Sequence, residues 1–151
     1  KENNNNIELH LTGPLQSNKV KEAIQIFDVF HTMDREKIAN EFSKYPNIIK
    51  QKKIFIQVNT GKEETKSGVY PNELNDFLYF CKIEKKLNII GLMCIPPNDD
   101  NTTIYFSEMQ KLNNLLGLKE LSMGMSADYK QAIKFDSTYV RIGSKIFGNR
   151  I

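Results

Sequence analysis

The last strand-like stretch of the chain carries an arginine, Arg141, close to its carboxyl end. Gly143 and Ser144 follow it, a glycine that lets a ligand approach the backbone and a hydroxyl beside the N–H groups of a short final turn. The preceding strand-like stretch ends on Ser126, which we interpret as a candidate helix N-cap with free N–H groups behind it. Ser126 alone would be explained as a plain cap, but two such segments at consecutive strand ends predict a phosphate site.

Arginine is rare in this chain, which gives Arg141 added weight. Of the 21 basic residues only three are arginines. An arginine inside an apolar strand therefore indicates a need for its planar fork or its permanent charge. Arg141 would hold the phosphate itself, or donate to a ring nitrogen that must stay unprotonated. The alternative is a structural salt bridge with Asp34 or Asp136.

Other residue types that carry chemistry form no catalytic arrangement. His10 and His31 lie in strand-like runs, where a histidine is more often a satisfied core or rim group, although His10 is near enough to the rim to line a pocket. No nucleophile has a paired base, and the aspartates form no dyad. Cys81 and Cys94 lack metal-ligand spacing. The sequence therefore predicts a binding site with no catalytic residues and no metal.

The elements that must position these residues alternate between two periodicities. Strand-like runs cover residues 7–13, 28–34, 54–60, 88–95, 120–126 and 137–143. Helical spacing is seen in residues 20–27, 36–42, 74–81, 105–116 and 128–135. This alternation predicts an α/β fold of parallel strands, either an open doubly wound sheet or a (β/α)8 barrel. No glycine-rich nucleotide motif follows the first strand, which weakens the doubly wound alternative.

The number of strands favours an incomplete TIM-type barrel. A barrel has eight strands in about 250 residues, whereas this chain has 151 residues and six strand-like runs. We therefore expect a barrel in which strands 3 to 8 are present and the first two βα units are missing. Residues 1–6 are read as a polar lead, and residues 7–151 as the partial barrel domain.

Composition limits the partners. Hydrophobic residues make up 40% and charged residues 26% of the chain, as in globular proteins, and no apolar run is long enough to span a bilayer. The net charge of +3 is scattered, and the cluster at residues 50–53 reads as a solvated loop. The two cysteines in apolar surroundings suit a reducing compartment. We expect a cytoplasmic protein with no nucleic-acid or membrane partner.

Six motifs in order resemble one known family. They are HLTGPLQSNK (10–19), HTMDR (31–35), QVNTGKEETKSG (57–68), GLMCIPP (91–97), LSMGMSADYKQAI (121–133) and STYVRIGSKIFG (137–148). Together they are similar to the pyridoxal-phosphate homeostasis protein family. The resemblance implies a (β/α)8 barrel like the N-terminal domain of alanine racemase. It also implies binding of pyridoxal 5′-phosphate (PLP), with management of that cofactor in place of a turnover reaction.

Position by position, the resemblance implies a set of cofactor contacts. Arg141 would face the pyridine nitrogen and make the ring a weak electron sink. The phosphate would be held by Ser126, Gly143 and Ser144. Met93 and Met125 would line the pocket nearby.

Three departures from the family pattern stand out. The family's Schiff-base lysine belongs to a segment that would precede Lys1, and Lys19 and Lys66 match other family positions. We therefore expect this chain to bind PLP non-covalently and weakly, or not at all. Asp136 replaces a usual glycine and Thr12 a usual large aliphatic residue, which affects turn geometry and inner packing.

The leading functional hypothesis is a PLP-binding protein that sequesters PLP and hands it to PLP-dependent apo-enzymes. The complete protein is expected to be a monomer. One alternative is a PLP-dependent amino-acid racemase of the same fold, which would need a C-terminal β-domain and a tyrosine from a dimer partner. Others are a phosphosugar-binding barrel without PLP and a truncated chain with no function of its own.

Overall fold

Six parallel strands form one sheet in the order β1-β2-β3-β4-β5-β6. The computed structural model describes residues 6–98 and 101–148, so most of the predicted polar lead lies outside the described residues. The strands are β1 (His10–Leu11), β2 (Val29–Met33), β3 (Lys53–Val58), β4 (Ile89–Cys94), β5 (Glu120–Met125) and β6 (Tyr139–Arg141). The helices are η1 (Ser17–Lys19), α1 (Val20–Ile26), α2 (Glu36–Ser43), α3 (Pro46–Ile49), α4 (Leu74–Tyr79), η2 (Phe80–Glu84), α5 (Thr102–Leu115), α6 (Tyr129–Ile133) and α7 (Ser144–Phe147).

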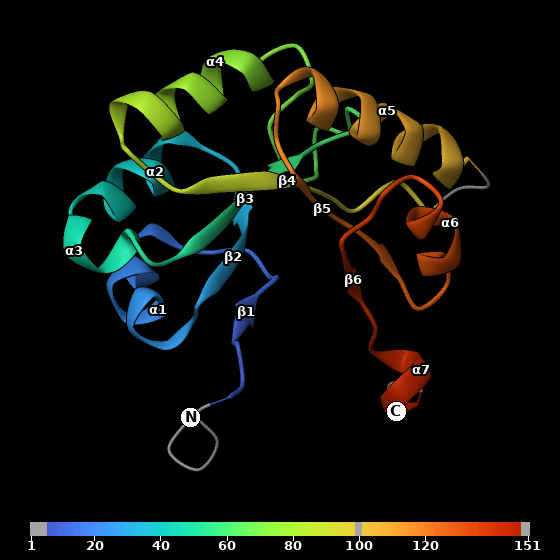
Figure 1. Ribbon diagram of the computed structural model, residues 1–151, viewed down its shortest axis with the longest axis horizontal. Coiled ribbons are helices and arrows are strands. Elements are labelled where there is room, and N and C mark those ends of the chain that lie inside the picture. Colours follow the sequence, from blue (N-terminus) through green and yellow to red (C-terminus); the bar gives the residue numbers. More distant parts are fainter. Residues whose placement is uncertain (1–5, 99–100, 149–151) are drawn as a thin grey trace.

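The sheet curves into a half-barrel with helices along its outer side (Figure 1). Each strand is hydrogen-bonded to the strands that precede and follow it in the chain, and β1 and β6 form the two edges. A doubly wound sheet reverses its strand order part-way, whereas a barrel does not. The sequential order therefore rules out the doubly wound alternative for the described strands, and the prediction of six parallel strands is confirmed.

The two faces of the sheet are packed differently. The outer face joins the helices in the main core, where the rings of Phe30 on β2 and Phe42 on α2 meet edge to face with centroids 4.9 Å apart. Each such buried side chain contributes about 1.5–3 kcal/mol. The inner face carries a smaller apolar cluster of Val29, Phe55 and Met93. Residues that alternate with the main core along each strand therefore point into the barrel.

All five predicted helical patterns correspond to helices, whereas some further short helices were missed. The patterns at residues 20–27, 36–42, 74–81, 105–116 and 128–135 correspond to α1, α2, α4, α5 and α6. The four-residue helix α3, which begins at Pro46, and the π-helix η2 are too short to show a period. Among the described residues, no helix combines the length and apolar character needed to cross a bilayer.

Asp136 occupies a position where glycine is favoured. Its φ is 62°, in the left-handed region. It lies at the C′ position of a Schellman motif after α6, in which the Ser137 N–H donates to the Ala132 carbonyl and the Asp136 N–H donates to the Ile133 carbonyl. The family's usual glycine at this position therefore has a structural cause, and aspartate is one of the few residues that tolerate it.

We expect Asp136→Ala to be less stable than Asp136→Gly by about 1 kcal/mol, because alanine keeps the Cβ that strains a left-handed backbone. Both variants lose the 2.6 Å hydrogen bond from Gln110 to the Asp136 carboxylate, so the pair isolates the backbone effect. Urea denaturation of the two variants measures the difference. Equal free energies of unfolding would contradict the assignment.

Candidate functional site

A cavity of about 990 Å³ opens at the carboxyl ends of the strands. Its lining comes from both edges of the half-barrel and from the loops after β4, β5 and β6. The lining residues are His10, Thr12, His31, Ile95, Met125, Ser126, Ala127, Tyr139, Val140, Arg141, Ile142, Gly143 and Ser144. The carboxyl ends of barrel strands are where such folds bind their ligands. Five of the six predicted site residues line this one cavity, and Met93 does not.

Arg141 ends β6 and is anchored by neutral oxygen atoms. Its Nη1 donates to the Ser122 carbonyl at 3.0 Å and to Ser122 Oγ at 2.7 Å, and its Nη2 donates to the Cys94 carbonyl at 2.7 Å. Burial lowers the pKa of the Arg141 guanidinium, yet arginine remains charged at any physiological pH. A guanidinium has five N–H groups, so two of them have no partner among the described residues. These two donors remain for a ligand in the cavity.

The alternative role of Arg141 in a salt bridge is wrong for the described residues. The Asp34 carboxylate pairs with Arg35 at 2.6 Å. The Asp136 carboxylate accepts from the side chain of Gln110. Both predicted partners are thus engaged elsewhere, and the direct hydrogen-bond partners of the Arg141 guanidinium among the described residues are carbonyl and hydroxyl oxygens, with the charge of Asp128 acting on it from further away.

Ser126 is not the N-cap that its sequence context predicted. Helix α6 starts later and is preceded by Asp128, and no side-chain cap bond is formed. Ser126 Oγ instead accepts from the N–H groups of Gly143 at 3.2 Å and Lys145 at 3.4 Å. These contacts join the loop after β5 to Gly143 in the loop after β6 and to Lys145 in the first turn of α7. Because the Ser126 oxygen accepts two bonds, its own O–H is free to donate into the cavity.

The start of α7 adds room and a second hydroxyl. A Cβ added at Gly143 would meet no atom within 4 Å, so the protein's own packing does not require a glycine there. Ser144 is exposed and also lines the cavity. Open space at Gly143 beside the hydroxyls of Ser126 and Ser144 makes a cradle whose donor set fits a phosphate group.

The two methionines differ in their positions. Met125 is 40% exposed and lines the cavity. Met93 is fully buried against Val29 and Phe55 in the inner cluster and lies outside the cavity lining. Met93 can therefore support the cavity floor only indirectly.

Sequence reasoning missed a polar chain inside the barrel. His31 Nε2 lies 2.9 Å from His10 Nδ1, and His31 Nδ1 lies 2.8 Å from Ser122 Oγ. Burial, followed by the charges of His10 and Arg141, lowers the pKa of His31 to about 3. The available signal was the alternation of β5, which puts Ser122 on the opposite face from the core residues on either side of it.

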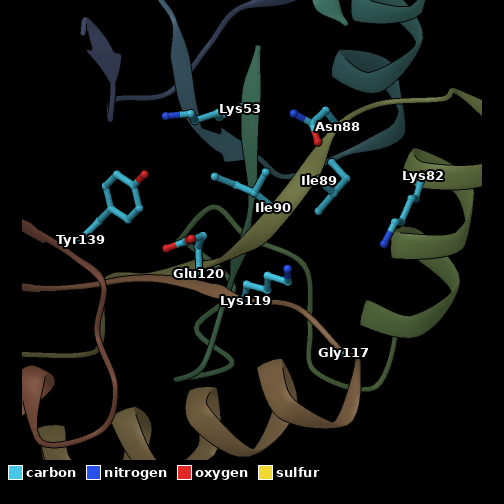
Figure 2. Close-up of a pocket in the computed structure, with 9 residues that line it drawn as sticks. All are labelled: Lys53, Lys82, Asn88, Ile89, Ile90, Gly117, Lys119, Glu120 and Tyr139. Atoms are coloured by element: carbon cyan, nitrogen blue, oxygen red, sulfur yellow. The ribbon is translucent and has the colours of Figure 1, made fainter. Parts of the chain in front are cut away.

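A second cavity, of about 390 Å³, lies at the other end of the strands (Figure 2). Its walls include Lys53, Ile89, Glu120 and Tyr139, which are the first residues of β3, β4, β5 and β6. Tyr139 lies at one side of this cavity, with its hydroxyl turned toward Lys53, and it also lines the larger cavity. In barrels the amino-end face serves stability, which makes the cavity at the carboxyl end the candidate ligand site.

Comparison with known proteins gives this geometry a family. Residues 3–150 match the family model described as the N-terminal domain of alanine racemase. The chain belongs to this family. The resemblance carried by the six motifs is thereby confirmed, because relatives from several bacteria bear the name pyridoxal phosphate homeostasis protein.

Two of these relatives show how far the similarity extends. The protein from Vibrio cholerae is 40% identical over 153 residues, which cover 95% of this chain and 65% of the relative. The protein from Aquifex aeolicus is 38% identical over 155 residues, which cover 95% of this chain and 68% of the relative. The chain thus spans slightly less than two thirds of the length of the Vibrio cholerae relative.

Solved structures agree with the fold. PipY of Synechococcus elongatus, in a structure described as having PLP bound, superposes with a TM-score of 0.82 at 29% identity, over 97% of this chain and 73% of PipY. Alanine racemase from Corynebacterium glutamicum has a TM-score of 0.70 at 14% identity, over 96% of this chain and 42% of that one, and this likeness concerns the fold alone.

Proposed function

We propose that this chain binds PLP in the cavity at the carboxyl ends of its strands. The observation that carries the proposal is Arg141, whose guanidinium is fixed by three hydrogen bonds to neutral oxygens and keeps two N–H groups for a ligand. The phosphate would lie against the hydroxyls of Ser126 and Ser144 and the open space at Gly143. The PLP-bound description of PipY supports this assignment.

The chemistry of Arg141 favours a carrier over an enzyme that needs a protonated pyridine ring, such as a transaminase. PLP supplies an electron sink when its pyridine nitrogen is protonated. Arginine cannot give up a proton at physiological pH, so a ring nitrogen that accepts from Arg141 stays unprotonated. We assign no catalytic residue in this chain. Its proposed role is to sequester PLP and to deliver it to PLP-dependent apo-enzymes in the cytoplasm.

Binding by these residues is proposed to be non-covalent. No lysine is among the described residues that line the 990 Å³ cavity. Lys66 lines an adjoining cavity and pairs with Glu63 at 2.6 Å. Affinity then depends on the phosphate cradle and on the contact with Arg141, with Met125 beside them.

The half-barrel itself is proposed to correspond to strands 3 to 8 of a (β/α)8 barrel, with residues 7–151 as one domain. The sequential order of the six strands and the share of the relatives' length that the chain covers support this numbering. Two further βα units between β6 and β1 would close the barrel, and the closed protein is proposed to be a monomer.

The phosphate cradle is tested by Ser126→Ala, which removes the free hydroxyl and the acceptor that joins the two loops. A hydrogen bond to a charged group contributes about 1.5–3 kcal/mol, so we expect PLP affinity to fall about tenfold or more. Equilibrium dialysis against PLP measures it, and inorganic phosphate should compete with PLP.

Ser43→Ala is the matched control for this substitution. The Ser43 hydroxyl donates to the Asn40 carbonyl on α2, away from the cavity, and its loss should leave affinity unchanged. Absence of PLP binding by the unaltered chain would refute the proposed function. Equal binding by Ser126→Ala and the unaltered chain would refute the phosphate cradle.

A further inference from the structure

A chain of hydrogen-bonded side chains connects Arg141 to the outside of the half-barrel. Arg141 Nη1 contacts Ser122 Oγ at 2.7 Å, and Ser122 Oγ contacts His31 Nδ1 at 2.8 Å. His31 Nε2 then contacts His10 Nδ1 at 2.9 Å, and His10 Nε2 contacts Glu8 Oε1 at 3.1 Å. Residues from β1, β2, β5 and β6 are joined in this way, although they are distant in sequence.

When His10 is neutral, the two ends of this chain set one direction for all of its bonds. Arginine can only donate, and an ionised carboxylate can only accept. Glu8 is ionised because its hydrogen bond with Lys53, 2.7 Å long, lowers the pKa of the Glu8 carboxyl. The three groups between Arg141 and Glu8 can donate as well as accept. Each of these three side chains uses both its donor and its acceptor within the chain only if it accepts from the neighbour on the Arg141 side and donates to the neighbour on the Glu8 side.

This direction assigns the protons. The Ser122 O–H donates to His31 Nδ1, so His31 carries its proton on Nε2. The His31 Nε2–H donates to His10 Nδ1, so His10 also carries its proton on Nε2 and donates to Glu8. Reversal would place the His31 N–H and the Arg141 N–H against the same Ser122 oxygen, and would leave the Ser122 proton without this acceptor.

His31 is suited to hold this arrangement. It is 1% exposed, stacks on Phe55 with ring centroids 4.5 Å apart at 11°, and meets the edge of Tyr139 at 6.0 Å. The groups that face it from neighbouring strands are His10, Ser122 and these two rings. Burial also lowers the pKa of His31 to about 3, so its imidazole is neutral at ordinary pH and one ring nitrogen keeps a lone pair. In the bond direction given above, that nitrogen is Nδ1, which accepts from Ser122.

We propose that Ser122, His31 and His10 are positioning residues that hold the Arg141 guanidinium in its orientation toward the cavity. A serine hydroxyl rotates freely unless its proton is committed. The acceptor on His31 commits it, which turns the Ser122 lone pair to Arg141 and restricts a side chain that otherwise has many rotamers. The inference rests on the proposed function only in naming PLP as the ligand; the positioning of Arg141 is argued from the protein's own contacts.

The decisive test is carried out on the PLP-free protein by ¹⁵N NMR of the histidine rings and of the Arg141 side chain. We expect His31 to be neutral with its proton on Nε2, and the Arg141 guanidinium to rotate slowly. In Ser122→Ala the Arg141 rotation should accelerate severalfold and the His31 Nδ1 signal should shift. A His31 proton on Nδ1, or unchanged Arg141 rotation in Ser122→Ala, would overturn the proposal.

The PLP affinity of variants extends the test. Ser122→Ala and His31→Phe should each weaken PLP binding about tenfold, the phenylalanine keeping the ring stack on Phe55. His31→Asn should lose less, because its amide oxygen can still accept from Ser122. Thr32→Val is the matched control, since it removes a buried hydroxyl that has no hydrogen-bond partner among the described residues. Its affinity should equal that of the unaltered chain.

The outcomes separate the two proposals. If the unaltered chain binds no PLP, the proposed function fails, and the Arg141 and His31 signals still decide the positioning role. If the unaltered chain and Ser122→Ala bind PLP equally well, the positioning role fails and the proposed function stands. If Thr32→Val weakens binding as much as Ser122→Ala, the effect is one of general packing and the positioning role fails.

Discussion

Arg141→Ala is expected to reduce the affinity for PLP about 100-fold, a loss of about 2.7 kcal/mol. The substitution removes the two N–H donors that remain for the ligand and the permanent charge beside it. Equilibrium dialysis gives the affinity, and the absorption spectrum of bound PLP reports the protonation of the ring nitrogen. Arg141→Lys should recover only part of the loss, because an ammonium group cannot reproduce the planar fork that bonds to Ser122 and Cys94.

Two controls separate a ring-nitrogen contact from a general effect of charge. Arg35→Ala removes an arginine that pairs with Asp34 and donates to the Leu15 carbonyl, and it should leave PLP affinity unchanged. A PLP analogue with a ring carbon in place of the nitrogen should bind the unaltered chain and Arg141→Ala about equally. If the analogue discriminates between them as strongly as PLP does, Arg141 does not contact the ring nitrogen.

The architecture could be predicted because it depends on local periodicity. Period-two and period-3.6 stretches alternate along the chain, and parallel strands joined by helices have few possible arrangements. The same rule predicted that Ser126, Arg141 and Ser144 lie together at the carboxyl ends of the strands, and in the structure they line one cavity there. Very short elements such as α3 were missed because four residues show no period.

The contacts of the site could not be predicted from the same patterns. Ser126 lies just before a helix and has the residue type of a cap, yet its partners are N–H groups of Gly143 and of Lys145 in α7. Arg141 was expected to need either a ligand or a carboxylate, and its anchors are two backbone carbonyl groups and the hydroxyl of Ser122. The bond between His31 and Ser122 spans 91 positions of sequence. Such pairings depend on how strands curve toward one another, which one sequence does not reveal.

Gly91→Ala is expected to lower the free energy of unfolding by about 3 kcal/mol or more, the upper part of the range for overpacking. A Cβ built on Gly91 would lie 1.9 Å from the carbonyl oxygen of Glu120 and 2.6 Å from its carbonyl carbon. Gly91 is paired with Glu120 in the register between β4 and β5. The obstructing atoms belong to the backbone of the adjacent strand, so no side-chain rotation can relieve the overlap.

Urea denaturation of Gly91→Ala beside Gly13→Ala measures this effect. A Cβ at Gly13 would meet no atom within 4 Å, and that variant should differ little from the unaltered chain. Equal stability of the two variants would contradict the close approach of β4 and β5. A large difference would show that the glycine of the GLMCIPP motif is needed for the contact between β4 and β5. These two strands hold Cys94 and Ser122, whose oxygens accept hydrogen bonds from Arg141. Displacement of those strands should then weaken PLP binding as well, although Gly91 itself lies outside the cavity lining.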